Sequence, residues 1–134
     1  MKNTKPPIVL LTDFGYEDHF TGVLKGVIAT IAPNATVIDL SHDIVPQNIL
    51  QASFLLSVSV GFFPEQSIFC VIVDPEVGSD RKALCIKTRH YYFIGPDNGV
   101  LWETARADGI ETMVELNNSE FFLDRLSATF HGRD

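Results

Sequence analysis

The sequence predicts an α/β protein of three layers, in which a mostly parallel central sheet lies between flanking helices. Short apolar runs rich in β-branched residues alternate with longer segments whose apolar residues recur at helical spacing. This strand–helix alternation is typical of a largely parallel sheet. The fold is therefore predicted to be Rossmann-like, although no Gly-x-Gly-x-x-Gly fingerprint of dinucleotide-binding proteins is present.

The first elements form a strand–helix–strand unit. Residues 8–11 are an uninterrupted aliphatic run and are predicted to be a buried strand. Apolar residues then recur at helical spacing through 20–31, and a proline follows that stops the helix. Gly22 and Gly26 inside this helix are expected to allow close packing on the sheet. Residues 36–40 are the second strand.

The second half of the chain continues the alternation and adds a hairpin. Pro46 opens a second helix that runs to about Val60, where Gly61 and Pro64 close it. Residues 68–73 are a third buried strand, and the hairpin after it makes the sheet mixed. The hairpin strands and the elements that follow are 83–88, 91–95, a short helix at 101–107, a strand at 112–116 and a helical piece capped by Asn118 or Ser119.

Length and composition indicate one ordered domain, 1–134, with 46% apolar residues. The net charge of −7 argues against nucleic acid, since non-specific binding needs a surplus of Lys and Arg. No apolar run is long enough to span a bilayer, and no signal peptide is recognisable, so a cytoplasmic protein without membrane contact is expected. Cys70 and Cys85 lie in strand patterns and are expected to be buried free thiols, and no metal-ligand spacing occurs.

Aspartates recur at or just past the carboxyl ends of the predicted strands. They are Asp13, Asp39 or Asp43, Asp74 and Asp97. Open α/β sheets bind ligands beyond this edge, so the acids predict a polar pocket for a ligand that carries hydroxyls or positive charge. The ordinary alternative for an aspartate such as Asp13 is a helix N-cap.

The segment 71–81 is the most informative part of the chain. A buried strand ends on Asp74, a proline and a glycine stop the run, and Arg81 follows seven residues after the acid. The two side chains are candidates for a reactive site, and the ordinary alternative is an ion pair that braces the loop. Among the histidines, His131 is a candidate site residue, whereas His19, His42 and His90 are predicted to lie on the surface.

Four segments in order resemble a known family. They are Thr12-Asp13-Phe14-Gly15 with Asp18 and Gly22-Val23-Leu24-Lys25-Gly26; Val73-Asp74-Pro75 to Arg81; Gly95-Pro96-Asp97-Asn98-Gly99; and Thr129-Phe130-His131-Gly132-Arg133-Asp134. Together they closely resemble the S-adenosyl-L-methionine hydrolases, or hydroxide adenosyltransferases, which are relatives of the bacterial fluorinase and chlorinase. The resemblance covers essentially the whole chain.

The resemblance implies an activity and an assembly. The activity is hydrolysis of S-adenosyl-L-methionine to adenosine and L-methionine, with this compound as substrate and no cofactor. The chain would be the N-terminal domain of a two-domain subunit whose smaller β-rich C-terminal domain is missing. The full-length protein is expected to be a homotrimer, with each active site between the N-terminal domain of one subunit and the C-terminal domain of its neighbour.

The resemblance also implies roles for individual residues. Asp74, Arg81 and His131 fall on a triad that prepares a water for attack on C5′. Arg81 stays protonated and cannot be the base, so either His131 or Asp74 takes the proton. The residues that fall on substrate-binding positions are Asp13, which would hold the ribose hydroxyls, Phe130 and Asn98.

One departure and two alternatives qualify this interpretation. Glu76 stands where the family usually has glycine, and would be strained if that position required a positive φ. The first alternative is a halogenase, but the halogenating relatives replace the acid found here at Asp74 and carry a small hydroxyl residue in place of Gly132. The second alternative is a non-catalytic module that binds adenosine or S-adenosylmethionine.

Overall fold

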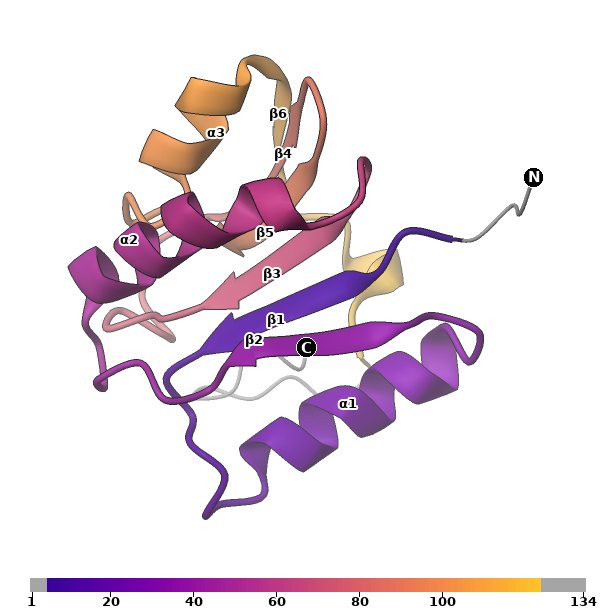
Figure 1. Cartoon of the computed structure of the whole chain (residues 1–134). Helices are drawn as coiled ribbons and strands as arrows, with labels where there is room; N and C mark the ends of the chain where they lie inside the picture. Colours follow the sequence, from indigo (N-terminus) through magenta and orange to yellow (C-terminus); the bar gives the residue numbers. More distant parts are fainter. Residues whose placement is uncertain (1–4, 124–134) are drawn as a thin grey trace.

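The computed structural model describes residues 5–123, which form a six-stranded sheet between two helical layers (Figure 1). Helix α1 covers one face of the sheet, and α2 and α3 cover the other. The predicted three-layer α/β architecture is therefore confirmed. The elements in order are β1 (Ile8–Thr12), α1 (Phe20–Ile31), β2 (Val37–Ser41), α2 (Ile49–Ser59), η1 (Val60–Phe62), β3 (Ile68–Ile72), β4 (Ala83–Thr88), β5 (Tyr92–Pro96), α3 (Trp102–Asp108), β6 (Ile110–Glu115) and η2 (Ser119–Phe121).

The strands of the sheet lie in the order β2-β1-β3-β5-β4-β6. Strands β2, β1, β3 and β5 are parallel, whereas β4 is antiparallel to both of its neighbours, as the predicted hairpin requires. From β1 the chain passes through α1 to β2 on one side, and it then returns through α2 to β3 on the other side. This reversal makes the carboxyl ends of β1 and β3 the expected ligand crevice of the sheet.

Both faces of β1 are buried, whereas β3 has one buried face and one partly buried face. Val9 and Leu11 belong to the apolar cluster beneath α2 and α3, whereas Leu10 belongs to the cluster beneath α1. In the first cluster the rings of Phe69 and Phe93 stack with their centroids 5.4 Å apart. Each such aromatic side chain buries about 150–250 Å², so the centre of the sheet is a well-packed support for the loops at its ends.

Helix α2 begins at Ile49 and not at Pro46. Gln47 has a φ of 66°, which lies in the left-handed region and is incompatible with a right-handed helix. The N-cap is Asn48, whose side-chain oxygen accepts a hydrogen bond from the backbone N–H of Gln51 at 3.0 Å. The proline therefore belongs to the turn before the helix.

The prediction that Gly22 and Gly26 pack closely on the sheet is wrong. A Cβ built at either position meets no other atom within 4 Å, apart from the neighbouring residues of the helix itself. The buried residues of α1 are instead Thr21 and Leu24, so both glycines lie on the exposed side of the helix.

The outer face of α2 carries an exposed apolar stripe. Leu50, Phe54 and Val58 follow one another at four-residue intervals and are between 50% and 83% exposed, and Phe62 beyond them is 89% exposed. No charged residue occurs from 44 to 64. An exposed apolar stripe of this kind is typical of a contact surface. Within residues 5–123, no helix is both long and apolar enough to cross a membrane.

Both cysteines are free and partly buried. Burial raises the pKa of both thiols, and that of Cys70 rises to about 11. Because the thiolate is the reactive form, Cys70 is a packing residue at neutral pH, as the strand pattern predicted.

Candidate functional site

The expected ligand crevice is bordered by two acidic residues. Thr12 at the end of β1 pairs with Ile72 at the end of β3, so the chains that leave these strands start side by side. Asp13 follows the first strand directly, and Asp74 lies two residues beyond the second. The topology thus brings two of the predicted site residues to one edge of the sheet.

Asp74 is held in place by Arg81. The Arg81 Nε donates to Asp74 Oδ2 at 2.6 Å, and a terminal guanidinium nitrogen contacts the same oxygen. The side chains are only 8% and 10% exposed, so the pair is largely removed from water. The other oxygen, Oδ1, accepts a hydrogen bond from the backbone N–H of Glu76 at 3.2 Å. The ion pair that the sequence offered as the ordinary alternative is present, and it fixes the direction in which the carboxylate points.

The backbone at Glu76 is not strained. Among the described residues, the positive φ angles outside glycine belong to Gln47 and Gln66, and in this loop the positive φ of 83° falls on Gly78. Glu76 is exposed, and its carbonyl accepts a hydrogen bond from the N–H of Ser79 at 2.9 Å. The glutamate therefore fits the loop, and its effect on the site is limited to the charge that it adds.

Asp13 is not the N-cap of α1. The N-cap position is His19, and the carboxylate of Asp13 instead accepts the backbone N–H of Gln47 at 2.7 Å. This bond reaches the left-handed residue before α2, so Asp13 ties the loop after β1 to the loop after β2. Its bonded oxygen is Oδ2, and the structure gives Oδ1 no hydrogen bond within residues 5–123. That oxygen is free to accept a ligand hydroxyl.

Asn98 connects the loop after β5 to the end of β3. Its amide nitrogen donates to the backbone carbonyl of Val73 at 2.8 Å, and its oxygen accepts the N–H of Val100 at 3.1 Å. The structure thus shows a bracing role next to Asp74, and contact with a substrate stays a prediction. Phe130 and His131 lie outside the described residues.

The other acids of the predicted rim differ in their surroundings. Asp39 binds Lys25 and the Nε2 of His42, the latter at 2.8 Å. Partial burial tends to raise the pKa of Asp39, but the hydrogen bonds from Lys25 and His42 outweigh it and leave the pKa below its ordinary value. Asp43 and Asp97 are exposed.

The prediction that His42 lies on the surface is wrong. Its side chain is 0% exposed, and its Nδ1 lies 2.6 Å from the Oγ1 of Thr12. A signal was present in the sequence, because Leu40, His42 and Ile44 continue the period-two pattern of a strand. By contrast, the side chain of His19 is 69% exposed and that of His90 is 41% exposed, so both lie on the surface as predicted.

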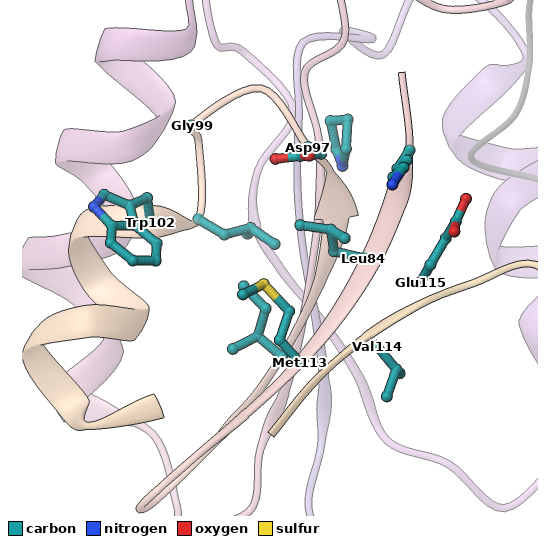
Figure 2. Close-up of a pocket in the computed structure, with 11 residues that line it drawn as sticks. Leu84, Asp97, Gly99, Trp102, Met113, Val114 and Glu115 are labelled. Atoms are coloured by element: carbon teal, nitrogen blue, oxygen red, sulfur yellow. The ribbon is translucent and has the colours of Figure 1, made fainter. Parts of the chain in front are cut away.

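A groove lies where α3 meets β4 and β6. Figure 2 shows this open groove of about 450 Å³, in which Trp102 of α3 stands opposite Leu84 and Met113. Asp97 and Glu115 lie at its polar end. Its lining does not include Asp13, Asp74, Arg81 or Asn98, so it is separate from the predicted site.

Residues 8–134 match the family described as "SAM hydroxide adenosyltransferase N-terminal domain". The chain belongs to this family. An (R)-S-adenosyl-L-methionine hydrolase from Salinispora arenicola is 38% identical over 130 residues, which are 96% of this chain and 49% of that protein. A crystal structure of an uncharacterized conserved protein from Thermotoga maritima superposes with a TM-score of 0.91 at 43% identity, covering 95% of this chain and 50% of that one.

The fluorinases are more distant members of this group. A fluorinase from Actinopolyspora mzabensis is 21% identical over 154 residues, which are 98% of this chain and 52% of the fluorinase. The match over residues 8–134 confirms the family resemblance inferred from the four motifs. The chain spans about half the length of these relatives.

Proposed function

We propose that this chain supplies the N-terminal half of an enzyme that hydrolyses S-adenosyl-L-methionine to adenosine and L-methionine. The observation that carries the proposal is the largely buried Asp74–Arg81 pair at the carboxyl end of β3, beside Asp13 at the end of β1. The hydrolase relative matches 96% of this chain at 38% identity, whereas the fluorinase matches 98% of it at 21% identity. The halogenase alternative is therefore the weaker one.

The reaction requires the protein chiefly to align the attacking water with C5′ and to remove a proton from that water. A water oxygen attacks C5′ while the C5′–S bond breaks, and the bonding pair returns to sulfur to give the neutral thioether of methionine. The proton that the water loses passes to Asp74 or His131. Arg81 holds Asp74 in a fixed orientation, and holding reactants in line contributes several kcal/mol in enzymes. In this arrangement Asp13 accepts the ribose hydroxyls with its available oxygen.

The active assembly is proposed to be a homotrimer in which a C-terminal domain of a neighbouring subunit completes each site. The uncharged apolar stripe of α2, made of Leu50, Phe54 and Val58, supports a contact between subunits, because most of its surface is exposed in the single chain. Chain 1–134 alone is therefore expected to hydrolyse its substrate very slowly. A cytoplasmic location stays a prediction from the sequence.

Incubation of the full-length protein with S-adenosyl-L-methionine tests the proposal. The expected products are adenosine and L-methionine in equal amounts, separated and quantified by chromatography. A 5′-halogenated adenosine in the presence of chloride or fluoride would replace the proposal with the halogenase alternative. Tight binding of adenosine with no turnover would establish the non-catalytic binding module.

A further inference from the structure

A network of hydrogen bonds runs from the partly exposed Lys25 on α1, through Asp39 on β2 and the buried His42, to Thr12 at the end of β1. Lys25 on α1 contacts Asp39, and the other oxygen of Asp39 lies 2.8 Å from the Nε2 of His42. The opposite ring nitrogen of His42 lies 2.6 Å from the Oγ1 of Thr12. That same oxygen accepts the backbone N–H of Phe14 at 3.2 Å.

The Nε2 of His42 faces a carboxylate oxygen of Asp39, which accepts, so Nε2 carries a proton. In the neutral form of His42 the other nitrogen, Nδ1, is then an acceptor. In that form the hydroxyl of Thr12 accepts from the N–H of Phe14 and donates its own proton to Nδ1. A neutral His42 of this tautomer satisfies every one of these polar groups, which is what a fully buried histidine requires.

The hydrogen bonds at the Thr12 end of this network restrain the backbone on both sides of Asp13. The ring closed by the hydroxyl of Thr12 and the N–H of Phe14 spans Asp13, so the rotamer of Thr12 fixes the backbone on both sides of the acid. The backbone carbonyl of His42 also accepts the N–H of Gly15 at 2.7 Å. Asp13 in turn accepts the N–H of Gln47 at 2.7 Å. The loops after β1 and β2 are thus held as one unit.

We propose that His42 is a positioning residue for Asp13, acting through the hydroxyl of Thr12. The inference rests on the proposed function, in which Asp13 binds the ribose. His42 does not itself touch the substrate, because its side chain is 0% exposed. Its acceptor atom Nδ1 sets the orientation of Asp13, while its donor atom Nε2 attaches the unit to Asp39.

Two substitutions of His42 distinguish the roles of its two ring nitrogens. His42→Asn places an amide oxygen near the position of Nδ1 and keeps an acceptor for Thr12. His42→Gln places an amide nitrogen near the position of Nε2 and keeps only the donor to Asp39. Thr12→Val removes the hydroxyl, and Thr12→Ser restores it. Asp108→Asn is the matched control, because Asp108 binds Thr88 and His90 in a similar cluster outside the proposed site.

Calorimetry on the full-length variants measures affinity for adenosine and for 2′,3′-dideoxyadenosine. We expect His42→Gln and Thr12→Val to lose roughly threefold to tenfold in adenosine affinity, the worth of one hydrogen bond, with little change for the dideoxy compound. His42→Asn, Thr12→Ser and Asp108→Asn should stay near wild type in their preference for adenosine. Equal losses in His42→Asn and His42→Gln, or unchanged affinity in both His42→Gln and Thr12→Val, would overturn the inference.

Amide hydrogen exchange at Gln47 provides a second measurement that needs no ligand. Exchange at Gln47 should quicken in Thr12→Val and stay slow in Thr12→Ser and Asp108→Asn, because only the first change releases Asp13. If wild-type protein binds neither nucleoside, the proposed function fails and this measurement still decides the inference. Unchanged exchange at Gln47 in a folded Thr12→Val protein would refute the positioning role.

Discussion

The side-chain amide of Asn98 donates to the backbone carbonyl of Val73 at 2.8 Å, one residue before Asp74. This bond joins two loops that leave neighbouring parallel strands, β3 and β5. Asn98 therefore influences the candidate site by holding the chain from which Asp74 projects.

Asn98→Ala is expected to lower both stability and turnover. Its two hydrogen bonds each contribute about 0.5–1.5 kcal/mol, and their loss also frees the backbone beside Asp74. Turnover in full-length protein should fall by roughly tenfold or more, since small displacements of reacting groups are costly. The control is Asn118→Ala, which removes an exposed cap on η2 and should leave turnover unchanged. Thermal denaturation and adenosine release measure the two effects.

Asp74→Asn and His131→Ala should each reduce turnover by about 10²–10⁴-fold, the usual contribution of general acid–base groups. If the residues act as one unit, the double variant is little slower than either single variant. The control is Asp80→Asn, because Asp80 is an exposed acid in the same loop. Additive losses in the double variant would show that Asp74 and His131 act separately.

Asp13→Ala should weaken adenosine binding by about 10²-fold or more, because hydrogen bonds to a charged group contribute about 1.5–3 kcal/mol each. The variant should also cease to distinguish adenosine from its 2′,3′-dideoxy analogue. Asp43→Ala is a suitable comparison, since Asp43 is an exposed acid in the loop after β2. Calorimetry on the full-length protein measures both affinities. Equal binding of the two nucleosides by wild type would leave Asp13 with only its structural bond to Gln47.

The stability of the folded domain should depend on pH through Asp108. Partial burial tends to raise the pKa of Asp108, but hydrogen bonds from Thr88 and His90 outweigh it and hold the pKa below its ordinary value of 3.8. The charged form therefore stabilises the fold above pH 3.8, and this contribution disappears as the pH falls through the lowered pKa.

The Asp108→Asn variant isolates this contribution. At pH 7 it should be less stable than wild type by about 1–3 kcal/mol, because buried donors lose a charged acceptor. The difference should shrink when both proteins are unfolded with urea at pH 3. A difference that stays constant between pH 7 and pH 3 would show that the charge of Asp108 is unimportant.

The sequence predicted the elements well wherever an apolar run decided the structure. Strands such as β1 and β3 are buried or partly buried on both faces, so their composition alone identifies them. The start of α2 was misplaced because Gln47 has a left-handed φ and donates its N–H to Asp13, which lies 34 residues earlier. Local propensity carries no information about such a contact.

In the candidate site, the sequence indicated contacts within one loop but not contacts between separate elements. The spacing of Asp74 and Arg81 allowed an ion pair as the ordinary alternative, and the pair is present because a single loop connects the two residues. The network of His42 was missed, because it joins Thr12, Asp39 and Lys25 from three separate elements. The period-two pattern of Leu40, His42 and Ile44 indicates that His42 is buried, but only the folded sheet places its hydrogen-bond partners together.

The apolar stripe of α2 is predicted to form a contact between subunits. Phe54 lies in the middle of this stripe and is 63% exposed. No charged residue occurs between 44 and 64. If the stripe forms a subunit contact, Phe54→Asp places an unpaired charge in the interface, and the full-length protein should dissociate in sedimentation experiments. Ile31→Asp is the matched control, because Ile31 is 70% exposed on α1, which covers the opposite face of the sheet (Figure 1). That variant should keep the wild-type mass. If Phe54→Asp also keeps it, the stripe is not the contact, and the subunits must meet through another surface.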